Sequence, residues 1–244
     1  MRSASAFGAF TFTATVFANL HFDWYIPDAP AQGIRSITFP MYQADAPRIS
    51  GYYFAQQFQI VDSNPNNGGL GYTGLQPGED IDGNSTIYAV FSNFGAGVTT
   101  SHPQCRGGAD GARDGVSCAL RFSGSYAPTY NILVENIGGT TWRGTITDTT
   151  SGIQRVIGEY TMPPTSGLIQ NYNIGFVEYY PWNGKVANCP AQPKTSVWFG
   201  KPIAAGVQGT LSGLRHSYPC EGNGQVALSS SPTTNGLTIN YGNV

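Results

Sequence analysis

The sequence predicts an all-β protein, built as a single antiparallel β-sandwich of the jelly-roll or concanavalin-like kind. Short segments that alternate between apolar and polar residues recur along the chain, and they are rich in Val, Ile, Thr, Tyr and Phe. Clusters of Gly, Pro, Asn and Asp separate these segments, as expected for turns. No window longer than about two turns has the period of roughly 3.6 residues that indicates a helix.

The first predicted strand ends near Trp24. Its apolar residues, such as Phe22 and Trp24, share one parity, whereas His21 and Asp23 share the other. Residues 1–18 fit a second interpretation, a signal peptide with an early Arg, an apolar stretch and a small-residue cleavage site. Both interpretations of residues 1–18 stay open, and residues 19–244 are expected to form one β-sandwich domain.

Ten further segments alternate in the same way and are predicted to be strands. They are 34–42, 52–61, 86–94, 118–122, 130–135, 141–147, 153–162, 172–180, 197–203 and 236–241. No linker-like stretch divides the series, and no internal repeat indicates a propeller or a β-trefoil. The segments therefore predict one sandwich.

Composition narrows the classes of partner. The 244 residues include 12 Lys or Arg and 14 Asp or Glu, and the net charge is −2. The few basic residues are scattered singly and form no stripe for a phosphate backbone, so we expect no nucleic-acid partner. Outside residues 1–18 no apolar run is long enough for a membrane helix, so we expect no membrane span. The oligomeric state stays open.

The four cysteines predict two disulfides. No two of them form a C-x-x-C motif, and no His lies at zinc-ligand spacing from any of them. Of the three pairings that four cysteines allow, we favour Cys105–Cys118 and Cys189–Cys220, because each would close a Gly/Pro-rich loop. A glycosylation sequon begins at Asn84. Together with the low Lys content, these features predict a secreted, extracellular glycoprotein.

No cofactor is expected, with a calcium ion at Asp80 and Asp82 as the alternative. The acidic segment 79–84 offers alternating oxygen ligands, but it lacks the spacing of an EF-hand, and we favour a solvated turn whose side chains cap the backbone. The segment 69–74 matches G-x-G-x-x-G. Because no helix pattern follows it, we interpret its glycines as allowing a strand to pass close beneath an aromatic ring.

Glu178 is the leading candidate for a catalytic residue. It shares its parity with apolar and aromatic residues, where a carboxylate is costly unless it has a partner or lines a cleft. Tyr179 follows it, and Arg215 and His216 lie near Cys220. If that segment folds over the strand, an acid, a base and a cation would meet, as a polysaccharide lyase or glycoside hydrolase requires. A structural role for Glu178 inside the sandwich remains the alternative.

Aromatic and amide residues predict a carbohydrate ligand. Flat rings stack on sugar faces, and amides bind hydroxyl groups without adding charge. We therefore expect a carbohydrate-binding, lectin-like protein, with the lyase or hydrolase and a structural or adhesive surface protein as alternatives. The candidate contacts are Tyr52, Tyr53, Gln57, Gln59, Tyr180 and Trp182.

Several motifs resemble a family of secreted domains of unknown function, some of which lie beside ricin-type lectin modules. The resemblance is carried by Gly51-Tyr52-Tyr53-Phe54, Gly69-Leu70-Gly71-Tyr72-Thr73-Gly74-Leu75-Gln76, Ala89-Val90-Phe91-Ser92 and Phe176-Val177-Glu178-Tyr179. It covers roughly residues 20–203. It implies a concanavalin-like or jelly-roll sandwich and an extracellular location, and it implies no established activity.

Overall fold

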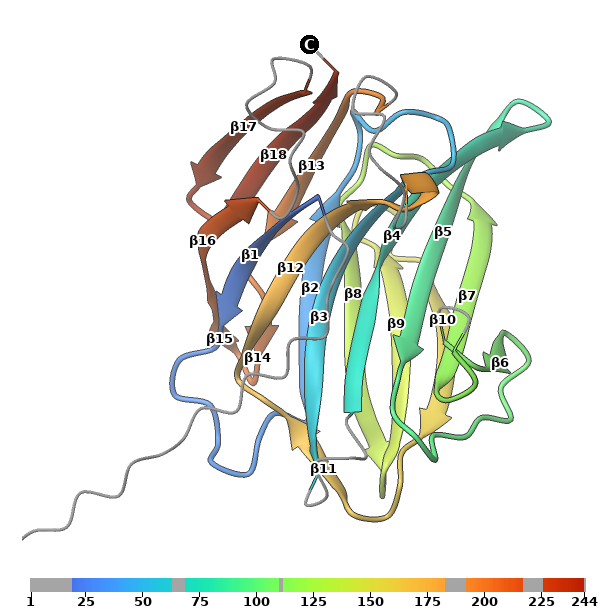
Figure 1. The fold of residues 1–244 in the computed structure, drawn as a ribbon, viewed down its shortest axis with the longest axis vertical. Coiled ribbons are helices and arrows are strands. Elements are labelled where there is room, and N and C mark those ends of the chain that lie inside the picture. The colour runs from blue at the N-terminus through green and yellow to red at the C-terminus, as the bar shows by residue number, and fades with distance from the viewer. Residues whose placement is uncertain (1–18, 63–68, 110–111, 183–191, 217–225, 244) are drawn as a thin grey trace, which may run out of the picture.

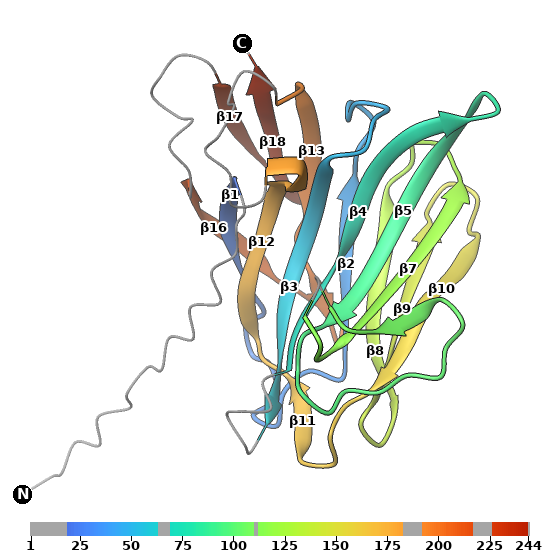
Figure 2. The same ribbon diagram turned by 45° about the vertical axis from the view of Figure 1, so that its right-hand side comes forward.

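The computed structural model describes residues 19–62, 69–109, 112–182, 192–216 and 226–243. These residues form two nine-stranded sheets. All ladders between the named strands are antiparallel. The two sheets pack face to face, as Figures 1 and 2 show, which confirms the predicted antiparallel β-sandwich.

The first sheet contains most of the residues singled out above. Its strand order is β16 (Thr210–His216), β1 (Leu20–Tyr25), β12 (Tyr172–Tyr179), β3 (Tyr52–Asp62), β4 (Gly69–Ile81), β5 (Asn84–Asn93), β7 (Val116–Ser123) and β6 (Cys105–Gly107). The short strand β11 (Ser166–Ile169) pairs with β3. We call the face of this sheet that points away from the second sheet the outer face.

The second sheet closes the core. Its order is β10 (Gln154–Thr161), β9 (Thr141–Asp148), β8 (Tyr130–Gly138), β2 (Ser36–Tyr42), β13 (Thr195–Gly200), β18 (Gly236–Asn243) and β17 (Val226–Thr233). A small hairpin, β14 (Ile203–Ala204) and β15 (Val207–Gln208), joins it beside β2.

Aromatic side chains dominate the core between the sheets. Phe22 and Trp24 are fully buried, as the alternation of β1 predicts. The Phe22 ring lies 4.8 Å from that of Phe199, and the Trp24 ring lies 5.5 Å from that of Phe39, measured between ring centroids. Each contact joins the two sheets, and burial of each such side chain stabilises the fold by about 1.5–3 kcal/mol.

Each of the ten predicted strand segments overlaps an observed strand, but several observed strands, among them the glycine-rich strand β4, were not predicted. Its glycines allow close packing. A Cβ atom at Gly71 would clash with the Phe58 ring, and one at Gly74 would clash with the Phe54 carbonyl oxygen. The strand therefore passes directly beneath an aromatic ring, as we had interpreted the motif.

The predicted disulfide Cys105–Cys118 is present, with an S–S distance of 2.03 Å. It joins register partners on β6 and β7. The second predicted pair, Cys189 and Cys220, lies outside the described residues, as do residues 1–18. Within the described part of the chain, no helix is long and apolar enough to cross a membrane.

We expect Gly71→Ala to destabilise the fold. The added methyl group would meet the Phe58 ring in the packed core, and overpacking of this kind costs roughly 1–3 kcal/mol. The measurement is the midpoint of urea unfolding. Gly107→Ala is the matched control, because nothing lies within 4 Å of the position that a Cβ atom would take there. Equal midpoints for both variants would refute the packing role of Gly71.

We also expect the fold to lose stability at alkaline pH. Burial raises the pKa of Tyr130 to about 12, and burial likewise raises the pKa of Tyr160. In the unfolded chain tyrosine ionises near pH 10. The stability that these groups contribute is therefore complete below about pH 10 and is lost as the pH rises toward 12. Tyrosinate absorbance should rise together with the loss of the circular-dichroism signal; full titration near pH 10 in a folded protein would contradict this.

Candidate functional site

A row of five side chains crosses the outer face of the first sheet. Glu178 on β12 pairs with Tyr53 on β3. Phe54 pairs with Leu75, so the same register places Gln76 on β4 beside Tyr53. Gln76 in turn pairs with Tyr88 on β5, and Tyr88 pairs with Arg121 on β7. Register partners project from the same face, so this row brings together residues from five strands.

An aromatic floor lies beside this row. Tyr53, Ala55 and Phe176 are buried although they belong to the outer face. The Phe176 ring lies edge-on to Tyr53 at 5.8 Å and to Tyr72 at 5.2 Å, between centroids. The Glu178 side chain, which is half-buried, therefore projects next to an apolar surface that excludes water from one side of it.

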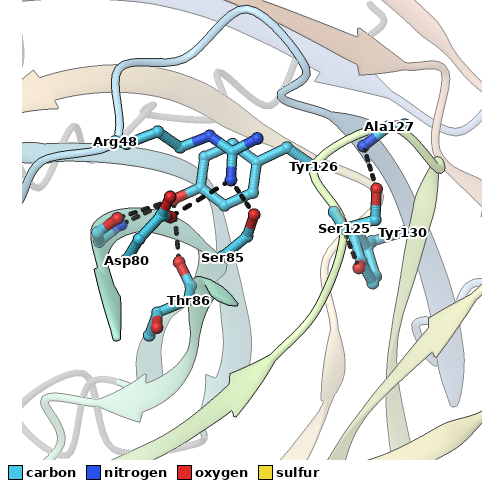
Figure 3. A network of polar contacts seen from close by, with 9 residues as sticks. Arg48, Asp80, Ser85, Thr86, Ser125, Tyr126, Ala127 and Tyr130 are labelled. Atoms are coloured by element: carbon cyan, nitrogen blue, oxygen red, sulfur yellow. Dashed lines mark hydrogen bonds and ion pairs between the residues drawn. The ribbon is translucent and has the colours of Figure 1, made fainter. Parts of the chain in front are cut away.

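A buried tyrosine fixes the hairpin that carries Gln76 (Figure 3). The Tyr126 hydroxyl accepts a hydrogen bond from the Gly78 amide at 2.8 Å and donates one to the Thr86 carbonyl at 2.9 Å. The Arg48 guanidinium lies 3.9 Å from the Tyr126 ring centroid and forms an ion pair with Asp80 at 3.5 Å. Burial raises the pKa of Tyr126, which keeps its hydroxyl able to donate.

This network lies close to the row. Gly78 and Thr86 are register partners, two residues from Gln76 and from Tyr88 respectively. The Gln76 side chain is half-buried, and among the described residues it makes no hydrogen bond. Its amide is thus held in place by its strand while its polar atoms stay available to a ligand. Next to it, the Arg121 guanidinium lies 5.1 Å from the Tyr88 ring centroid.

A second polar cluster borders Glu178. His21 on β1 pairs with Phe176, which is two residues from Glu178 along β12. Arg215 donates from Nε to His21 Nε2 at 3.0 Å and forms an ion pair with Asp23. A ring nitrogen that accepts a hydrogen bond carries no proton, so this contact places the proton of a neutral His21 on Nδ1.

The structure therefore brings Arg215 and Glu178 to one face, with His21 between their strands. His216 was the histidine predicted for this role. Its backbone pairs with Leu20 on β1, and its side chain lies outside the described residues. His21 is the histidine that the described residues place on the outer face beside Glu178.

Two predicted site residues face the core instead. Tyr52 is fully buried, its hydroxyl donates to the Pro193 carbonyl at 2.5 Å, and its ring lies 5.0 Å from that of Tyr179. Successive residues of a strand point to opposite faces, so Tyr53 and Glu178 project outward while Tyr52 and Tyr179 project inward. This corrects the expectations that Tyr52 contacts a ligand and that Tyr179 takes part in catalysis.

The other predicted contacts lie on or near the outer face. Gln57 donates from Nε2 to the Asn173 side-chain oxygen at 2.6 Å, and Gln59 is half-exposed. Tyr180 packs against the aromatic floor, and burial raises its pKa. Trp182 ends the short 3-10 helix Tyr180–Trp182, and its side chain lies outside the described residues.

The predicted calcium ligands stand on the β4–β5 hairpin. The Asp80 carboxylate pairs with Arg48, and a guanidinium there opposes a second cation. Asp82 lies in the turn with a φ of 50°. Among the described residues, no group of three or more His, Cys, Asp or Glu could hold a metal ion. Asn84, the predicted glycosylation site, is exposed on the same hairpin.

Two hollows in the described part of the chain lie away from the row. One, of about 350 Å³, lies beside the loop between β1 and β2, and the other, of about 460 Å³, lies at one end of β13, β17 and β18. Neither is lined by a residue of the row.

Sequence reasoning missed Gln76 and His21 as site residues. The signal for Gln76 was its parity with Leu70 and Tyr72 in a segment that the glycines made hard to recognise as a strand. The signal for His21 was its place on the polar parity of the first strand. Neither pattern by itself identifies the neighbours on other strands, because pairing between strands is not encoded locally.

Comparisons with known proteins give structural neighbours only. No family model and no curated protein matches the sequence. Crystal structures of Scytalido-glutamic peptidase with a peptide-based transition state analog and with a transition state analog inhibitor each align at 13% identity, with TM-scores of 0.48 and 0.46. SCP-B, a member of the Eqolisin family of peptidases in complex with the tripeptide Ala-Ile-His, aligns at 12% identity with a TM-score of 0.44. Each alignment covers 94% of this chain and 100% of the other. Similarity at this level carries no conclusion about chemistry.

Proposed function

We propose that the outer face of the first sheet hydrolyses amide bonds of an extended polypeptide. The observation that carries the proposal is the placement of Glu178 and Gln76 on opposite sides of Tyr53. Their Cα atoms are two strand spacings apart, about 10 Å. Both side chains are long enough to lean over Tyr53 toward one another, which leaves space for a single substrate group between carboxylate and amide.

Glu178 and Gln76 can take separate roles in amide hydrolysis. The Glu178 carboxylate accepts a proton from a water molecule, and the water oxygen bonds to the carbonyl carbon. The Gln76 side-chain N–H donates a hydrogen bond to the oxyanion that forms. When the C–N bond breaks, Glu178 returns its proton to the leaving nitrogen. The water molecule is thereby divided between the new carboxyl group and the new amine.

The neighbouring charges favour this reaction over the glycosidic alternative. Glycoside hydrolysis normally requires two carboxyl groups flanking the bond. The row of five side chains contains one carboxyl group, that of Glu178. A single carboxyl group with a neighbouring amide fits acyl transfer better, since the amide can stabilise an oxyanion.

We expect Glu178→Gln to lower kcat at least about 100-fold, because it removes the general acid–base. Gln76→Leu should lower kcat by roughly 100- to 1,000-fold, because it removes the oxyanion donor. The measurement is cleavage of internally quenched peptides from acid to neutral pH. Glu79→Gln, at an exposed position on the same hairpin, serves as the control. A folded wild-type protein that cleaves no peptide, or a Glu178→Gln variant with an unchanged rate, would refute the proposal.

Carbohydrate binding is the second candidate function. Three tyrosine rings of the outer face, Tyr53, Tyr72 and Tyr88, lie among the amides of Gln57 and Gln76. Rings and amides in alternation suit a neutral sugar chain. We also propose that the protein is secreted, which the Cys105–Cys118 disulfide supports.

If the second function holds, the wild-type protein should bind members of a broad glycan array or insoluble polysaccharides, and Tyr88→Ala should weaken that binding about tenfold. Ile137→Ala, at an exposed position on the second sheet, is the control. Absence of binding from a folded sample would remove this candidate.

A further inference from the structure

Two exposed tyrosines lie side by side at one end of the outer face. Tyr25 on β1 and Tyr172 on β12 are register partners, with exposed fractions of 45% and 61%. In the described residues they are the only aromatic members of the exposed large apolar side chains. Both follow the outer-face parity, Tyr25 with His21 and Tyr172 with Glu178. Side chains this exposed contribute little to the stability of the fold, and their rings are available to a partner.

A continuous lane connects these rings to Glu178. The outer-face residues of β12 between them are Ile174, which is half-buried and offers apolar surface, and Phe176, which is fully buried. Tyr172 and Glu178 are six residues apart on one strand, or about 20 Å at roughly 3.3 Å per residue. Along the edge of the lane, Asp23 and Arg215 neutralise one another, so this edge offers no net charge to a ligand.

We propose that Tyr25 and Tyr172 form a remote subsite for the polypeptide substrate, which binds an apolar side chain about six residues from the scissile bond. The inference rests on the proposed function, because it takes Glu178 as the reacting end of the lane. An extended peptide rises by the same length per residue as the strand beneath it. The spacing between Glu178 and the tyrosines therefore corresponds to about six substrate residues.

A peptide fits this lane better than a charged polymer. The rings and Ile174 supply apolar contact. Contact with the two rings would add binding energy at a distance from the reacting bond, which lowers KM for long substrates. Short substrates that end before the tyrosines would not gain it.

The test compares matched twelve-residue peptides that differ only in having Phe or Ser six positions from the cleaved bond. Two series place that residue on the amino or the carboxyl side of the bond. In one series wild-type protein should cleave the Phe peptide with a KM roughly 5- to 10-fold lower. The Tyr25→Ala/Tyr172→Ala double variant should lose this preference. Ile153→Ala removes a similarly exposed side chain from the segment before β10, and this variant should keep the preference for the Phe peptide.

A binding measurement separates this inference from the proposed function. Glu178→Gln protein is titrated into labelled Phe and Ser peptides, and fluorescence anisotropy reports Kd without cleavage. A preference for Phe that disappears with the two tyrosines supports the subsite even if no variant cleaves peptides, a result that would refute only the proposed function. Cleavage or binding without any preference overturns the subsite. Tyrosine-dependent binding of oligosaccharides in place of the Phe peptide overturns the peptide as its occupant.

Discussion

Strands β3 and β12 bury side chains on both of their faces, and the geometry of the outer face depends on this double packing. On the core side, Phe54 and Val177 pair and are fully buried. On the outer side, Tyr53 and Phe176 are also buried, although no second sheet covers them. Aromatic rings achieve this by covering one another. The strands are thus held rigidly from both sides, which is what a precisely spaced row of functional groups requires.

Glycine makes the double packing sterically feasible. A Cβ atom at Gly175 would clash with the Phe22 ring and would lie 2.7 Å from the Gln56 side-chain oxygen. At this position, large core side chains occupy the space that a side chain on β12 would need. Gly71 of β4 likewise leaves space for the Phe58 ring. The space that these residues leave lets large rings fill the core while the outer face keeps its register.

The sequence allowed the fold class, the positions of ten strands and one disulfide to be predicted, because each depends on local alternation or local spacing. The site was predicted less well. Glu178 and Arg215 do lie on one face, but Tyr52 and Tyr179, which were predicted to be site residues, project toward the core. Parity alone does not say which face of a strand is buried. Gln76 and His21 become neighbours of Glu178 only through pairing across strands distant in sequence, and glycines obscured the alternation of β4.

The two polar clusters of the outer face have different consequences for chemistry. In the cluster of β1 and β16, the Arg215 guanidinium forms contacts with both His21 and Asp23, so their charges and lone pairs are largely used within the protein. In the row across β12, β3 and β4, Gln76 keeps its amide unpaired among the described residues. Unpaired amide groups beside an apolar floor gain more from a ligand than from water, because the floor lowers the local dielectric constant. Chemistry is therefore expected in the row, while the arginine cluster holds the edge of the sheet and sets the charge beside it.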